Sequence, residues 1–128
     1  MTGNNRDSAV NRRSLGSRYE ELAADFLEKN GLRILRRNYR CKCGEVDIIA
    51  MDGNVLVFAE VKYRKTGRYG SSLEAVDMRK RKTISRVSRW YLTACAGSLE
   101  IPCRFDVIGI EGERIRWVKD AFPYCGPA

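Results

Sequence analysis

Histidine is absent from this chain of 128 residues. Its absence excludes Ser-His-Asp and Cys-His catalysis, and it also excludes metal sites that depend on imidazole ligands. Any hydrolytic chemistry here therefore has to use carboxylates, lysine and a hard metal ion.

A disulfide framework is not expected either, because the chain has five cysteines, an odd number, and no visible secretory signal. Cys41 and Cys43 flank a lysine, but no second close pair accompanies them. A zinc site would also have to recruit the distant Cys103 and Cys125, so zinc is a disfavoured alternative.

Long apolar runs are missing, and no stretch approaches the roughly 18 unbroken apolar residues that a membrane span requires. Met1–Ser14 contains arginines without an apolar segment behind them, which is typical of neither a secretory signal nor an anchor. We therefore expect a cytoplasmic protein with no membrane partner. We expect one domain at residues 15–120, preceded by a mobile basic arm at 1–14 and followed by a tail at 121–128.

Positive charge is in excess, since 24 Lys and Arg face 16 Asp and Glu, which gives a formal net charge of +8. Such a field attracts polyanions, and nucleic acid is the leading candidate partner because neutralising phosphates releases counterions. The alternative is a basic surface with no partner.

Hydrophobic periodicity divides the chain into helices and strands. Its strands alternate with helices in a way that predicts an α/β fold, and a strand, a long helix and another strand imply a right-handed crossover in a mixed sheet. The predicted elements are a helix from Tyr19 stopped by Asn30-Gly31, a strand at Leu32–Arg40, a hairpin of Glu45–Met51 and Asn54–Lys62, a helix from the N-cap Asp77 to Cys95, and strands at Cys103–Ile110 and Arg114–Val118.

The hairpin turns at Asp52-Gly53, a strong short-range hairpin signal. A two-residue loop there pairs Met51 with Asn54, which places Asp47 opposite Phe58 and Glu45 opposite Glu60. Alternation then puts Glu45, Asp47, Glu60 and Lys62 on one face, and Val46, Ile48, Val57, Ala59 and Val61 on the other.

Two carboxylates on this face call for compensation, because a diagonal pair such as Asp47 and Glu60 lies only about 7 to 8 Å apart. A shared Mg²⁺, for which Mn²⁺ is a substitute, would compensate them while keeping waters for a phosphate. The carbonyl of Val61 is a further candidate ligand, and Lys62 is a candidate to position or activate the attacking water. The alternative is a set of solvated polar residues, or a plain ion pair of Glu60 with Lys62. The strongly apolar hairpin favours the metal site, because charges inside a core strand usually have a partner or a function.

Three blocks, Gly44–Ala50, Val57–Arg64 and Arg104–Val107, resemble the YraN-like family of uncharacterised endonuclease-like proteins. That family resembles archaeal Holliday junction resolvases and the wider restriction-endonuclease-like superfamily, whose signature is an aspartate, a spacer, and Glu or Asp, any residue, Lys. The resemblance implies a restriction-endonuclease-like mixed central sheet flanked by helices.

The resemblance also implies site residues. Asp47 and Glu60 would be metal ligands and Lys62 the water-orienting residue. Glu20 in the first helix would assist the metal and Lys80 in the second helix would reach a phosphate; each is alternatively a surface charge. Glu45, which alternation and not the resemblance places on the face of Asp47, is a further candidate to assist. Tyr19 departs from the small residue that the family more often has there, and Cys41 and Cys43 are not part of the pattern.

Further contacts to nucleic acid are expected from basic and aromatic side chains. The loop after Tyr63 offers Arg64, Lys65, Arg68 and Tyr69, and its alternative interpretation is a solvated loop. An outer stripe on the second helix, formed by Arg79, Lys82, Arg86 and Arg89, either extends this phosphate track or is a solvated helix face.

These features predict a metal-dependent nuclease that hydrolyses phosphodiester bonds in DNA, with branched DNA in repair or recombination as a candidate substrate. A non-cleaving accessory protein that binds nucleic acid and retains the fold is the alternative from another class. A ribonuclease, or an enzyme acting on another phosphodiester, is a third. A homodimer is a hypothesis by analogy with the resolvases.

Overall fold

The computed structural model describes residues 18–64 and 76–126. The predicted arm at 1–14 and the loop residues Lys65, Arg68 and Tyr69 lie outside these ranges. The division of the chain into arm, domain and tail therefore stays a prediction.

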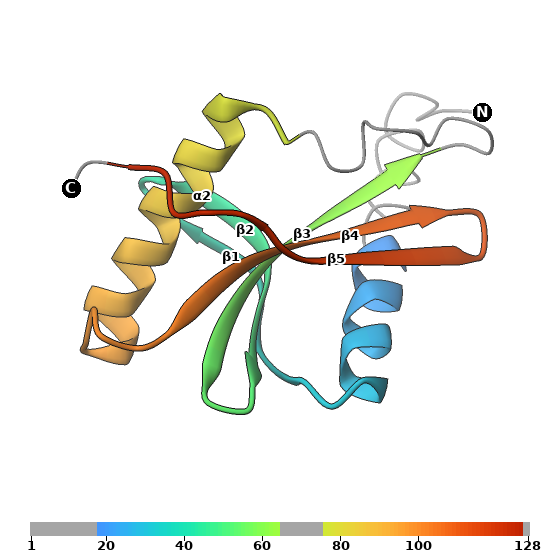
Figure 1. Ribbon diagram of the computed structural model, residues 1–128, viewed down its shortest axis with the longest axis horizontal. Coiled ribbons are helices and arrows are strands. Elements are labelled where there is room, and N and C mark those ends of the chain that lie inside the picture. The colour runs from blue at the N-terminus through green and yellow to red at the C-terminus, as the bar shows by residue number, and fades with distance from the viewer. Residues whose placement is uncertain (1–17, 65–75, 127–128) are drawn as a thin grey trace, which may run out of the picture.

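The predicted order of elements is confirmed (Figure 1). A helix at residues 18–29 is followed by β1 (Arg33–Cys41), β2 (Gly44–Asp52), β3 (Val55–Arg64), α2 (Met78–Tyr91), the short π-helical continuation η2 (Leu92–Ala96), β4 (Cys103–Glu111) and β5 (Arg114–Phe122). Asp77 caps α2 as predicted, because its Oδ1 accepts a hydrogen bond from the Lys80 N–H at 2.9 Å. None of the described helices is long and apolar enough to cross a membrane.

The five strands form one sheet in the order β1-β2-β3-β4-β5. The pairing of β3 with β4 is parallel, and the other three pairings are antiparallel, so the sheet is mixed. The parallel pair is joined through α2, as a crossover requires. The α/β class is thereby confirmed, and the arrangement is consistent with a restriction-endonuclease-like fold.

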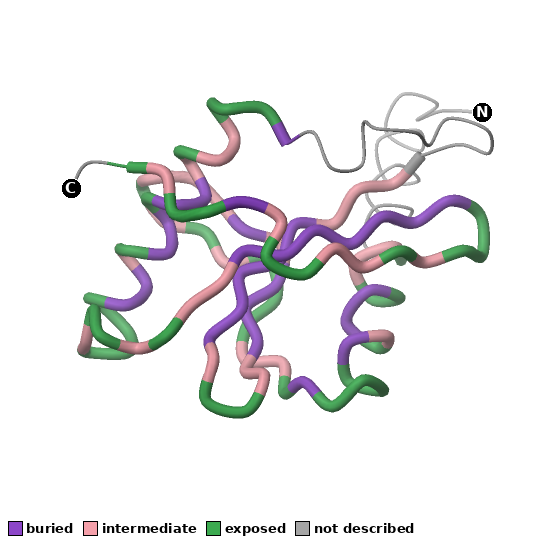
Figure 2. The backbone as a smooth tube through the Cα atoms, in the orientation of Figure 1, coloured by how far each residue is buried: buried purple, intermediate pink, exposed green. Residues whose placement is uncertain are grey.

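Each face of the sheet is covered by one helix, and the central strands β2, β3 and β4 are largely buried, whereas β1 and β5 at the edges are not (Figure 2). The helix at 18–29 contributes Ala23 and Leu27 to a core with Ile48, Val57 and Ile108. On the opposite face, α2 builds a second core whose members include Ile84, Val87, Tyr91, Ile49, Leu56, Phe58 and Phe105. The sheet is thus the middle layer of three, and side chains in its centre are shielded on both sides.

The predicted register of the β2–β3 hairpin is wrong by two residues. Asp52 pairs with Val55 and Met51 with Leu56, so the loop consists of Gly53 and Asn54 rather than Asp52 and Gly53. Gly53, with φ +62°, occupies the first loop position, where some tight hairpin turns require glycine. A shift of two residues keeps the alternation of faces, so it moves Asp47 from beside Phe58 to the level of Glu60 without turning it over.

The sheet forks beyond that level (Figure 1). The β2–β3 pairing ends at Ile48 and Ala59, while β2 stays paired with β1 down to Gly44 and β3 stays paired with β4 up to Arg64. Asp47 and Glu60 are the first residues past the last pair. The fork between β2 and β3 is therefore lined by one acidic residue from each strand.

Side-chain alternation in β2 also breaks at the fork, which corrects the prediction that Val46 and Ile48 share a face. Ile48 packs in the core beneath the helix at 18–29, whereas Val46 packs in the core beneath α2. The neighbouring strand is irregular at the same level, because Asn38 of β1 has φ +53°. The distortion leaves Asp47 between the two layers.

Further along the sheet, β4 and β5 are locked together by the fully buried carboxylate of Asp106. Its two oxygens accept hydrogen bonds from Arg104 Nε at 3.0 and 3.2 Å, Trp117 Nε1 at 2.9 Å and the Asp120 N–H at 2.9 Å. Arg104 also reaches Asp52 at the β2–β3 turn, with Nη1 2.8 Å from Oδ2. Asp106 thus joins β4 to β5 directly, and through Arg104 it is also connected to the β2–β3 turn.

Asp106→Ala should lower the free energy of unfolding by about 3 to 5 kcal/mol, because it leaves a buried guanidinium, an indole N–H and a backbone N–H without their acceptor. Urea titration followed by circular dichroism measures the loss. Glu113→Ala, at the exposed β4–β5 turn, is the matched control and should change stability by less than about 0.5 kcal/mol. Equal stabilities for the two variants would contradict a structural role for Asp106.

Candidate metal centre

At the fork, the carboxylate of Asp47 accepts a hydrogen bond that a backbone carbonyl of β2 would accept in a continuous ladder. Its Oδ2 accepts a hydrogen bond from the Val61 N–H at 2.8 Å, at a point where β2 no longer supplies a carbonyl to β3. The N–H and C=O of one strand residue point toward the same neighbouring strand. The Val61 carbonyl therefore faces the same gap as Asp47.

Glu60 is buried beside it, with 9% of the residue exposed. Its Oε2 lies 3.0 Å from Lys80 Nζ of α2. Its Oε1 is buried and has no hydrogen-bond partner among the described residues. Burying a carboxylate oxygen without a hydrogen-bond donor costs free energy. Glu60 Oε1 is therefore able to bind a ligand that the chain itself does not supply.

Both helices direct a charged side chain to the fork from their first turns. Lys80 is the third residue of α2 and is positioned by the Asp77 cap. Glu20 lies in the first turn of the helix at 18–29, near Asp47. Burial is the main cause of the raised pKa of Glu20, and the negative charge of Asp47 is the second. The fork thus collects carboxylates from a helix and two strands.

Burial dominates the electrostatics of these groups. It raises the pKa of Asp47 to about 7, with the negative charge of Glu60 as the second cause. Burial also raises the pKa of Glu60, although the ammonium of Lys80 opposes the rise. Burial alone would lower the pKa of Lys80, but Glu60 and Asp47 raise it overall and keep Lys80 charged. Two carboxyl groups this close titrate as a pair.

The other predicted site residues are distributed around this cluster. Lys62 follows on β3, and its charge lowers the pKa of Glu60. Glu45 forms an ion pair with Arg40 at 2.8 Å, yet its charge still contributes to raising the pKa of Asp47. Arg64 ends β3, and its side chain lies outside what the structure describes.

A divalent ion fits the donor set of the fork. Among the described residues, no three Asp, Glu, Cys or His side chains are grouped to hold an ion by themselves. The candidate ligands are instead two carboxylates, Asp47 and Glu60, with the Val61 carbonyl. Mg²⁺ characteristically binds through one or two carboxylates and keeps several waters, so this set is sufficient for it.

The ion-pair partner of Glu60 was not predicted from the sequence. The sequence indicated Lys62 as the alternative partner, whereas the ammonium found at hydrogen-bonding distance is that of Lys80. The available signal was Asp77, because an N-cap fixes which residues occupy the first turn of the helix. The stacking of Tyr19 on Tyr63, with ring centroids 4.0 Å apart, was also missed, because it joins segments distant in sequence.

Comparison with known sequences gives the family. The sequence profile described as "Uncharacterised protein family UPF0102" matches residues 19–110, which include all of the residues at the fork. The chain belongs to this family. A UPF0102 protein of Nitrosococcus oceani is 40% identical over 114 residues, covering 86% of this chain and 92% of the relative. One from Lachnoclostridium phytofermentans is 40% identical over 117 residues, covering 91% and 99%. The YraN-like resemblance is confirmed at the level of this family, and the names of these UPF0102 relatives describe no activity.

Asp47→Asn should make the protein more stable than wild type at pH 8, by about 1 to 3 kcal/mol, when divalent ions are chelated. Between the ordinary pKa of an aspartate and the value of about 7 in the fold, the folded state binds more protons than the unfolded state. Wild-type stability therefore falls as pH rises through this window, and the amide escapes the loss while keeping an acceptor for the Val61 N–H.

Urea unfolding of both proteins between pH 5 and pH 8 measures the difference, which should shrink as the pH falls. Asp25→Asn, on the exposed side of the helix at 18–29, is the matched control and should track wild type. A gap between Asp47→Asn and wild type that does not vary with pH would show that burial does not perturb Asp47.

Proposed function

We propose that this protein is a metal-dependent nuclease that hydrolyses phosphodiester bonds in DNA. The observation that supports it most strongly is the pair of buried carboxylates at the fork, Asp47 and Glu60, one of which has an oxygen without a protein donor. Two carboxylates and a carbonyl around a gap in a sheet are suited to hold Mg²⁺, or Mn²⁺ in its place.

Asp47 and Glu60, in their deprotonated forms, would hold the ion, and the Val61 carbonyl would complete the protein's share of the ligands. Such an ion would supply Lewis-acid chemistry to the scissile phosphate and the attacking water. The ammonium group of Lys62 would orient the water and stabilise the negative charge that develops on the phosphate. Lys80, 3.0 Å from Glu60, would contact a substrate phosphate, and Glu20 would assist through Asp47.

The excess of positive charge supports a nucleic acid as the substrate. By analogy with the resolvases that the sequence resembles, we propose branched DNA, a role in repair or recombination, and a homodimer that presents two such sites. We also propose phosphate contacts by Arg64, Lys65 and Arg68 and base stacking by Tyr69, and a cytoplasmic location.

Asp47→Ala and Glu60→Gln should each slow cleavage by about a thousandfold, because each removes a ligand of the ion that activates the water. Purified protein is incubated with branched, duplex and single-stranded DNA and with RNA, in Mg²⁺, Mn²⁺ or EDTA, and products are resolved on denaturing gels. Asp25→Ala is the matched acidic control. Cleavage by Asp47→Ala at the wild-type rate would mean that the activity is a contaminant or belongs to another site.

One observation favours a second candidate, a non-cleaving protein that binds nucleic acid. The ion pair of Lys80 with Glu60, at 3.0 Å, already neutralises part of the charge at the fork. If this pair is the permanent partner of Glu60, the fork is a structural feature and the basic surface is the functional one.

Lys80→Met separates the two candidates by stability. In EDTA it should lower the free energy of unfolding by about 1 to 2 kcal/mol, since it strips the cation from Glu60 at a half-exposed site. Added Mg²⁺ should restore the loss and raise the melting temperature of Lys80→Met more than that of wild type, because no ammonium competes for Glu60. Lys29→Met, exposed on the helix at 18–29, is the control. If Mg²⁺ changes the stability of neither wild type nor Lys80→Met, the non-cleaving candidate is favoured.

A further inference from the structure

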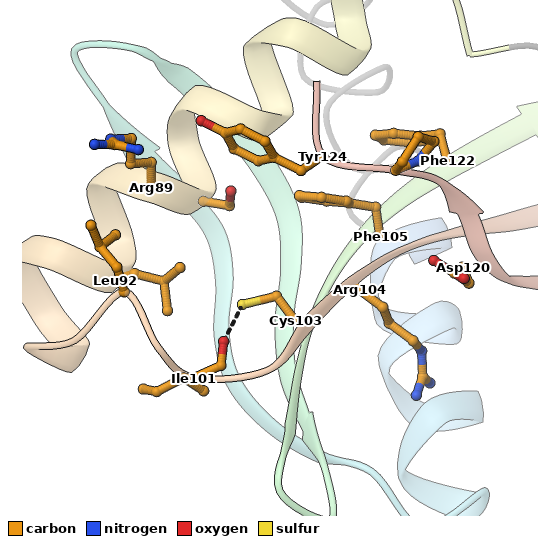
Figure 3. Close-up of a pocket in the computed structure, with 12 residues that line it drawn as sticks. Arg89, Leu92, Ile101, Cys103, Arg104, Phe105, Asp120, Phe122 and Tyr124 are labelled. Atoms are coloured by element: carbon orange, nitrogen blue, oxygen red, sulfur yellow. Dashed lines mark hydrogen bonds between the residues drawn. The ribbon is translucent and has the colours of Figure 1, made fainter. Parts of the chain in front are cut away.

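Three adjoining hollows follow the outer side of α2, away from the fork. The first, of about 370 Å³, lies between α2, the segment leading into β4 and the C-terminal tail (Figure 3). The second, of about 260 Å³, shares Arg89 and Tyr124 with the first. The third, of about 300 Å³, shares Arg86 with the second. The three hollows therefore adjoin one another along α2, and together we call them the α2 groove.

The tail that forms one wall is fixed to α2 by specific contacts. The Cys125 N–H donates a hydrogen bond to Ser85 Oγ at 2.8 Å, and Ser85 is fully buried. The Cys125 thiol contacts the Met78 sulfur at 3.2 Å, and the Arg81 guanidinium lies 5.4 Å from the centre of the Phe122 ring. The groove is therefore a built feature of the fold.

The charge of the groove is of one sign in its second and third hollows. Lys82, Arg86 and Arg89 line them, and no acidic residue does so among the described residues. These three positions are spaced at i, i+4 and i+7, which places them on one side of the helix, pointing the same way. A row of cations of this kind matches a chain of phosphates.

Aromatic rings interrupt this row. Trp90 and Tyr124 both line the second hollow, and Tyr124 is 44% exposed. Lys42 from the β1–β2 turn lies 5.1 Å from the centre of the Trp90 ring. The first hollow continues with apolar side chains, including Leu92, Leu99 and Phe105. A half-buried ring at Trp90 and an exposed ring at Tyr124, beside cations and an apolar recess, suit flat aromatic groups that are linked by negative charges.

We propose that this groove binds a single-stranded segment of nucleic acid. Its phosphates contact Lys82, Arg86 and Arg89, and its unpaired bases stack on Trp90 and Tyr124. A duplex keeps its bases stacked inside the helix and offers these rings no base face, so the aromatic residues select the unpaired strand. The groove lies on a different side of α2 from Lys80, because residues two apart on a helix do not face the same way, so the groove is separate from the fork.

The proposal rests on the proposed function only in taking nucleic acid as the ligand, and its test uses no metal and no cleavage. Fluorescence anisotropy in EDTA measures binding of the full chain to a labelled single-stranded oligonucleotide and to a duplex of equal length. Trp90→Ala and Tyr124→Ala should each weaken single-strand binding by about tenfold and change duplex binding by less than about twofold. Trp90→Phe, which keeps a ring, should restore most of the single-strand affinity.

Arg86→Ala with Arg89→Ala should weaken single-strand binding and reduce its salt dependence by about one to two ion equivalents. Arg33→Ala with Arg36→Ala, which removes two exposed arginines of β1 outside the three hollows, is the charge-matched control. Wild-type single-strand affinity in both aromatic variants would overturn the proposal, and so would an equal loss for single strand and duplex. Tyr124 is an exposed tail residue, so its variant keeps the test valid if Trp90→Ala unfolds, which a melting curve reveals. Loss of cleavage in Asp47→Ala with intact single-strand binding would separate the groove from the metal centre.

Discussion

The hydrogen bond from the Val61 N–H to the Asp47 carboxylate, 2.8 Å long, is the contact on which the fork depends. A strand that loses its neighbour exposes a row of donors and acceptors, and such groups need partners when they are buried. Asp47 closes the end of the β2–β3 ladder with its side chain, so the Val61 N–H keeps an acceptor where the two strands separate. Burial and the negative charge of Glu60 raise the pKa of Asp47, and this hydrogen bond opposes the rise.

Separation of the strands gives both layers access to one point. A continuous sheet would isolate the helix at 18–29 from α2, because each helix covers a different face. At the fork, Glu20 from one helix and Lys80 from the other both act on Asp47. The helical cap at Asp77 and the break in the alternation of β2 are the local features that make this convergence possible.

Sequence alone was sufficient for the class of fold, since it depends on the hydrophobic period. The true register brings Asp47 to the level of Glu60, but the break in the alternation of β2 leaves Asp47 between the two layers, which parity alone did not predict. The fork was not predictable from the sequence, because it arises where β2 stays paired with β1 while β3 stays paired with β4, and the sequence does not show which neighbour each strand keeps. For the same reason Lys80 entered through family resemblance alone, and the bonds from Trp117 and Arg104 to Asp106 were not anticipated at all.

Two buried carboxylates of this sheet, those of Asp106 and Glu60, differ in whether both of their oxygens accept hydrogen bonds. Asp106 receives donors on both oxygens, including a guanidinium and a backbone N–H, so the chain satisfies it internally. Glu60 receives one ammonium, and its second oxygen is buried without a donor. The other buried atom in this condition, Arg104 Nη2, belongs to a cation whose remaining nitrogens are already paired. A fold that can satisfy one interior carboxylate completely has no structural need to leave another incomplete. The deficit at Glu60, beside a second carboxylate and an open strand edge, is the feature on which the proposed cation site rests, because two neighbouring carboxylates attract a cation.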